Sequence, residues 1–140
     1  MIVPALSVRQ PWASLIDHGA KTIETRRWYT RYRGPLVICS SRRPADQGPT
    51  GMALCIVSMM ACRPMTVEDE PAARCRLYEG AFAWCFRQVW GLRSFAVRGQ
   101  LGIFDLDVPE RAFLTPEHRH EVQKLVVWSK ERQKPKGLIL

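Results

Sequence analysis

The sequence predicts an α+β fold, a small β-barrel of about six strands with a short first helix and a C-terminal helix. Several apolar segments of strand length are separated by turns that contain glycine and proline. Only two segments show the spacing of an amphipathic helix, and no apolar stretch approaches the roughly 18 residues that span a membrane. The length of 140 residues suits one domain over residues 1–140, and 46% hydrophobic residues are enough for a folded core.

The two helices are expected near opposite ends of the chain. The first covers residues 12–18, where apolar side chains recur on one face, and Gly19 ends it because glycine accepts a positive φ. The second covers about residues 115–134. Thr115 is suited to cap its start, Pro116 suits the first turn, and basic side chains near its end favour the helix dipole.

The strands are expected between these helices and just before the first one. Their ranges are 5–8, 21–27, 36–40, 52–65, 81–89 and 101–106. In the second range, alternation places Ile23 and Thr25 on one face and Glu24 and Arg26 on the other. The fourth range is the longest, and the strand is expected to bend near Ser58.

The five cysteines predict reduced thiols in a cytoplasmic protein. Their spacing contains no CxxC pair and no pairing with closely spaced histidines, so we expect no metal site and no cofactor. The first residues are soon followed by polar and basic ones, which is unlike the apolar core of a secretory signal.

An excess of basic residues makes nucleic acid the leading candidate partner. Lysine and arginine number 21 against 13 acidic residues, for a net charge of +8 and a pI near 9.7. Within residues 21–43, basic side chains are interleaved with Trp28, Tyr29 and Tyr32. Guanidinium groups bind phosphate and aromatic rings stack on bases, so this stretch indicates RNA, single-stranded nucleic acid or a nucleotide-like small molecule. The alternative is that the rings pack in the core and the arginines are only solvated.

Lys21 and Glu24 are candidates for the polar centre of a cleft. Their odd spacing keeps them off one face of an ideal strand, but both reach one cleft if Lys21 lies at the mouth of the strand. Such a pair is either a salt bridge or an acid–base pair. A buried lysine needs the glutamate nearby because an unpaired buried charge is costly.

Three segments resemble the ASCH domain family. They are residues 6–13 (LSVRQPWA), 19–26 (GAKTIETR) and 32–36 (YRGPL), and the family signature GxKxxExR is met by Gly19, Lys21, Glu24 and Arg26. A later segment, residues 97–102 (VRGQLG), is similar to the closing strand of the family. The resemblance covers about residues 6–107.

The resemblance implies a PUA-like barrel, with a cleft between the first helix and the sheet, and it implies RNA binding. We expect Lys21, Glu24 and Arg26 at the polar core of the cleft. The remaining residues expected at the site are Gln10 and Trp12 as its wall, Arg31, Arg33 and Ser40 as its flank, and Gln100.

Two alternatives stand beside a non-catalytic RNA-binding module. Some members of the family resemble ribonucleases, or amidohydrolases that remove an acetyl group from a modified nucleoside such as N-acetylcytidine, and Lys21 and Glu24 would then be catalytic. The amidohydrolases have a threonine where this chain has Glu24. The other alternative is a partner-binding domain, a monomer or weak homodimer, in which the strand over 82–86 and the apolar tail over 138–140 mediate contacts.

Overall fold

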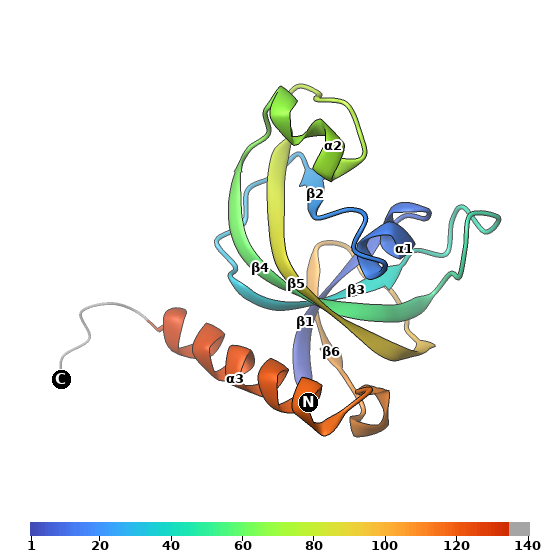
Figure 1. Ribbon diagram of the computed structural model, residues 1–140, viewed down its shortest axis with the longest axis vertical. Coiled ribbons are helices and arrows are strands. Elements are labelled where there is room, and N and C mark those ends of the chain that lie inside the picture. The colour runs from blue at the N-terminus through green and yellow to red at the C-terminus, as the bar shows by residue number, and fades with distance from the viewer. Residues whose placement is uncertain (135–140) are drawn as a thin grey trace.

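The computed structural model describes residues 1–134 of the protein (Figure 1). The strands are β1 (Ile2–Val8), β2 (Ile23–Arg26), β3 (Gly34–Ser40), β4 (Met52–Pro64), β5 (Phe82–Ala96) and β6 (Ile103–Asp107). The helices are α1 (Trp12–Asp17), α2 (Glu70–Ala73) and α3 (Pro116–Arg132), with short 3-10 helices η1 (Val67–Asp69) and η2 (Glu110–Ala112). The predicted α+β class, the short first helix and the C-terminal helix are confirmed, and the tail over 138–140 lies outside the described residues.

The strands form one sheet in the order β2-β5-β4-β3-β1-β6, which curls into a half-barrel (Figure 1). The β1–β3 pair is parallel and the other pairs are antiparallel. Within the described residues, β2 and β6 are the two edges of the sheet and do not pair with each other. The half-barrel therefore has an open side between these two edge strands (Figure 1).

The long strands β4 and β5 supply most of the curvature. Their register shifts between Val57 and Met59 and again between Met59 and Ala61, so the pairing is irregular next to Ser58, where a bend is expected. An extra residue in one strand bends it and strengthens its twist. β5 continues to Ala96, beyond the end expected at residue 89, because its second half keeps pairing with β4, from Trp90 opposite Ile56 to Ala96 opposite Met52.

The helix α3 packs across the outside of the sheet beside β3 (Figure 1). Val122, Val126 and Ser129 are buried on its inner face. Gly34 allows this close approach because a Cβ there would lie 2.7 Å from the Cβ of Ser129, and its φ of +136° also favours glycine. The segment that precedes β3 is thereby held against the C-terminal end of α3.

The aromatic strand over 82–86 belongs to the core. Trp84 is fully buried, and its ring meets that of Trp28 edge to face with 4.7 Å between centroids. Phe82 and Phe86 are partly buried against the same hydrophobic cluster. The apolar character of this strand is therefore explained by packing, which removes the reason to expect an exposed contact surface there. No helix among residues 1–134 is long and apolar enough to cross a membrane.

A buried carboxylate holds the turn that leads from β4 into α2. Both oxygens of Asp69 accept hydrogen bonds from Arg63, at 2.7 and 2.8 Å, and one also accepts from the backbone N–H of Thr66 at 2.8 Å. These bonds favour the ionised form, so the pKa of Asp69 lies well below its ordinary value of 3.8. The turn leads into α2, which brings the Ala73 carbonyl to Lys21 and the Cys75 thiol to Thr25.

We predict that Asp69→Asn lowers the free energy of unfolding by about 2 kcal/mol at pH 7, because two charge-assisted bonds are lost. A depressed native pKa contributes stability that is complete above 3.8 and is lost as the pH falls through the native pKa. Urea unfolding at pH 7 and pH 3 checks this: the gap between wild type and variant should shrink at pH 3. An equal gap at both pH values would contradict the assigned role.

Candidate functional site

A cleft of about 530 Å³ opens between α1, β2 and the segment that follows α2. It is lined by Ser7, Val8, Arg9, Trp12, Lys21, Glu24, Thr25, Arg26, Arg27, Ser41, Cys75, Tyr78, Gln100, Leu101 and Gly102. Four of the expected cleft residues from the first 26 positions are among them, namely Trp12, Lys21, Glu24 and Arg26, and so is Gln100.

Arg26 bridges the open side of the half-barrel. Its Nη2 donates to the carbonyl oxygen of Ser7 in β1 at 2.7 Å, and its Nε and Nη2 donate to Glu24 Oε2 at 3.3 and 3.1 Å. The pairing of β1 with β6 ends at Leu6 and Ile103, so the Ser7 carbonyl has no partner on β6. The Arg26 guanidinium supplies that partner and links β2 to β1.

Lys21 lies at the base of the cleft with only 2% of its surface exposed. Its backbone N–H donates to Leu15 in α1, and its Nζ donates to the carbonyl of Ala73 at the end of α2. Nζ also lies 3.5 Å from Glu24 Oε1, so the expected meeting of the two side chains in one cleft is observed. Burial lowers the pKa of the Lys21 ammonium below its ordinary value of 10.5, and the charge of Glu24 opposes this effect.

Aromatic and basic side chains form the outer walls of the cleft. Trp12 from α1 is 37% exposed, and its Nε1 donates to the carbonyl of Arg74 at 3.4 Å. On the other wall, the guanidinium of Arg27 lies over the ring of Tyr78, 5.4 Å from its centroid. Arg9 is exposed and completes the rim. Two flat rings and two cations therefore border one cavity.

Gln10 and Ser40 lie where they stabilise the frame instead of lining this cleft. Gln10 is buried; its Nε2 donates to Ser14 Oγ at 2.8 Å and to the Pro49 carbonyl at 2.7 Å, which ties α1 to the 41–51 loop. The Ser40 hydroxyl accepts from the backbone N–H of Met52 at 3.2 Å, across the β3–β4 pair. The Gln10 amide and the Ser40 hydroxyl were expected to contact a ligand. In the fold, the Gln10 amide bonds Ser14 and Pro49, and the Ser40 hydroxyl bonds the backbone of Met52.

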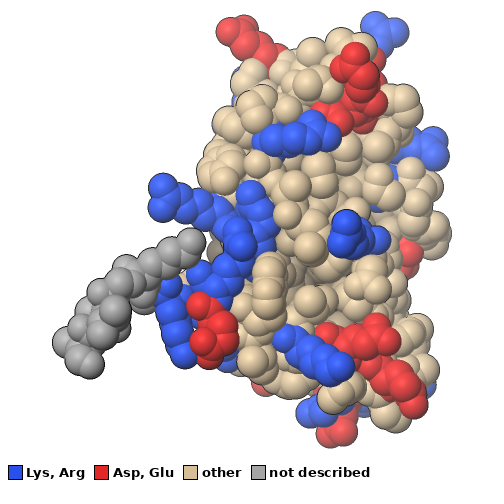
Figure 2. Space-filling view, turned by 60° about the vertical axis from the view of Figure 1, so that its left-hand side comes forward, with Lys and Arg blue, Asp and Glu red and all other residues tan. Residues whose placement is uncertain are grey.

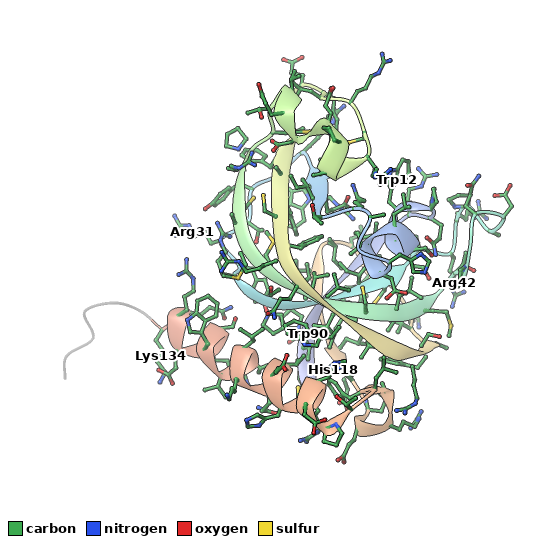
Figure 3. The ribbon with its side chains drawn as sticks, viewed as in Figure 1. Trp12, Arg31, Arg42, Trp90, His118 and Lys134 are labelled. Atoms are coloured by element: carbon green, nitrogen blue, oxygen red, sulfur yellow. The ribbon has the colours of Figure 1, made fainter. Side chains whose placement is uncertain are left out.

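Arg31 and Arg33 line a separate hollow, with Tyr29, Arg132 and Gln133. Figure 3 places Arg31 on the opposite side of the β4–β5 ribbon from Trp12 and Arg42. Figure 2 shows basic side chains gathered where α3 ends. The expectation that Arg31 and Arg33 flank the cleft is therefore not met, because the chain crosses from β2 to the α3 side before β3 begins.

Several cleft residues were not singled out from the sequence. Tyr78 and Cys75 follow α2, in a stretch with no clear periodicity, and only the path of the chain brings them to Lys21 and Thr25. The Cys75 thiol lies 3.7 Å from the hydroxyl of Thr25. Arg9 lies within the LSVRQPWA segment, whose resemblance to the family could have indicated it as a cleft residue. Residues 1–134 contain no group of three or more histidine, cysteine or acidic residues placed to hold a metal ion.

Comparison with known proteins assigns the family. The model of the ASCH domain matches residues 6–94, so the chain belongs to the ASCH domain family. A segment of 43 residues is 49% identical to activating signal cointegrator 1 of Homo sapiens and 51% identical to that of Mus musculus. The match covers 30% of this chain and only 7% of each of those much longer proteins.

Solved structures confirm the fold. The chain is similar to the crystal structure of ASCH from Zymomonas mobilis, with a TM-score of 0.56 over 87% of this chain and 94% of that one, at 16% sequence identity. It is also similar to a tyrosine-to-phenylalanine mutant of that protein, with a TM-score of 0.54 over 87% of this chain and 96% of that one, at the same identity. The half-barrel with its early short helix and C-terminal helix is thus the fold of ASCH proteins.

We predict that Glu24→Gln destabilises the protein by about 3 kcal/mol or more, because it leaves the buried ammonium of Lys21 and the partly buried guanidinium of Arg26 without their anion. Lys21→Met should cost less, since Arg26 still neutralises Glu24. Urea unfolding measures both, and Glu79→Gln is the matched control because Glu79 is exposed and should change stability by less than about 0.5 kcal/mol. A Glu24→Gln effect as small as the control would show that the buried pair is not structural.

Proposed function

We propose that this protein is a non-catalytic RNA-binding protein that holds a short single-stranded segment in its cleft. The observation that carries the proposal is the pairing of Trp12 and Tyr78 with Arg9 and Arg27 around one cavity. Unpaired bases stack on aromatic rings and on guanidinium planes, and arginine binds phosphate through paired N–H groups. Membership of the ASCH family supports the same proposal.

The inner charges of the cleft favour binding over catalysis. Glu24 Oε1 accepts from the backbone N–H of Thr25 at 3.0 Å and faces Lys21, while Oε2 accepts two bonds from Arg26. A general base needs a free lone pair directed at substrate, and both oxygens already have partners. Lys21 likewise donates to the Ala73 carbonyl. These three ionic side chains shape the cleft, and the outer side chains are left to contact the ligand.

The cluster of Arg31, Arg33 and Arg132 is proposed as a second contact for longer strands. Arg27 lines the cleft and Tyr29, two residues later, lines the second hollow, so the intervening chain connects the two surfaces. Arg33 lies 5.9 Å from the ring centroid of Tyr29 and is held by the carbonyls of Thr30 and Tyr32. A guanidinium fixed beside a ring is suited to a phosphate next to a base.

We predict that binding of a single-stranded RNA is strongly salt-dependent. If about four phosphates are contacted, log Kobs should fall with log salt concentration at a slope of roughly −3. Arg27→Gln should make the slope shallower by about 0.7, because one phosphate contact is lost. Arg111→Gln, which removes the same charge from η2, is the control and should leave the slope unchanged. Fluorescence anisotropy with a labelled RNA measures this, and a slope near zero would refute the proposal.

A hydrolase is the second candidate function, and one observation favours it: a buried lysine of lowered pKa beside a glutamate in a cavity. The substrate would be RNA or a modified nucleoside such as N-acetylcytidine. Wild type and Lys21→Met are incubated with an RNA pool and with N-acetylcytidine, and the products are read by gel and mass spectrometry. We expect no product from either protein. Product from wild type alone would establish the hydrolase and overturn the non-catalytic proposal.

A further inference from the structure

A second groove of about 640 Å³ adjoins the cleft, between the 41–51 loop and the segment that leads into β6. Its lining is Ser7, Ser40, Ser41, Arg42, Gly51, Arg98, Gly99, Gln100 and Leu101. Ser7, Ser41, Gln100 and Leu101 also line the cleft, so the two cavities share a wall. A ligand seated in the cleft therefore has a direct route into the groove.

The charges of the groove fit an anion. Arg42 and Arg98 come from two different loops, and both are exposed. Neither forms an ion pair within residues 1–134, and no acidic residue lines the groove. The Ser41 hydroxyl and the Gln100 amide add neutral donors. Two guanidinium groups with hydroxyl donors match the oxygen atoms of a phosphate group.

Ser7 marks the junction of the groove and the cleft. Its carbonyl is held by Arg26 on the cleft side, whereas its Oγ is buried and has no hydrogen-bond partner in the part of the chain that the structure describes. A buried hydroxyl without a partner is uncommon and needs an explanation. The neighbouring position is Gly99, where a Cβ would lie 2.7 Å from Ser7 Oγ. A side chain at residue 99 would therefore collide with this hydroxyl, so a glycine lets the segment that leads into β6 pass close to β1 at the wall of the groove.

We propose that this groove binds the phosphate of a nucleotide whose base or sugar occupies the cleft. The inference rests on the proposed function and narrows it: the ligand is a nucleotide or an RNA strand with a phosphate adjacent to the bound base. A free nucleoside lacks the phosphate that the groove would bind. Arg42 and Arg98 bind the phosphate oxygens.

The test compares nucleotides with nucleosides on one protein. Isotope-labelled wild type is titrated by NMR with each of the four ribonucleoside 5′-monophosphates and with the four nucleosides. We expect at least one nucleotide to bind about tenfold more tightly than its nucleoside, as a charge-assisted contact provides. Arg42→Gln/Arg98→Gln should abolish this preference and leave nucleoside binding unchanged. Gly99→Ala should weaken nucleotide binding without a change of charge, and Arg111→Gln is the control for charge alone.

Each result has a separate meaning. Equal binding of nucleotide and nucleoside by wild type, or a preference that survives in the double variant, overturns the groove and leaves cleft binding intact. A preference lost only when Arg31 and Arg33 are replaced by glutamine assigns the phosphate to the cluster beside α3 and also overturns the inference. If neither nucleotides nor single-stranded RNA bind wild type, the proposed function and the inference both fail.

Discussion

The architecture of the cleft depends on one buried carboxylate, that of Glu24. One oxygen faces Lys21, whose ammonium reaches the end of α2, and the other binds Arg26, whose guanidinium reaches Ser7 in β1. Parts of the chain that share no backbone ladder are thereby joined through a single side chain. The burial of Lys21 and Glu24 and the partial burial of Arg26 are tolerated because each charge has an opposite charge and a hydrogen-bond partner.

This arrangement separates two kinds of positive charge. The inner cations, Lys21 and Arg26, are neutralised by Glu24 and serve the fold. The outer cations at Arg9 and Arg27 have no carboxylate partner within residues 1–134, and they border the cavity beside the aromatic walls. In the proposed function an anionic ligand meets the outer set, so affinity and salt dependence are expected to arise there, whereas loss of the inner set would act first on stability.

The sequence predicted the site correctly where the residues that meet are close together along the chain. Lys21, Glu24 and Arg26 lie within six consecutive residues, so their meeting required only a strand with Lys21 at its mouth. Trp12 was expected at the cleft because residues 6–13 resemble the family. Gln10, by contrast, belongs to the same segment but uses its amide on Ser14 and Pro49. A polar residue type indicates that a partner is needed, and it does not say whether that partner is a ligand or the backbone.

By itself the sequence determined the α+β class, the two helices, most of the strands and the ionic centre of the cleft, because these follow from periodicity and from neighbours along the chain. Only the tertiary structure determined which other side chains line the cleft around that ionic centre. It brought Tyr78 and Cys75 to Lys21, and it carried Arg31 and Arg33 away to α3. The physical reason is that bulges in the β4–β5 pair curl the sheet, and this curl determines which segments distant in sequence come into contact.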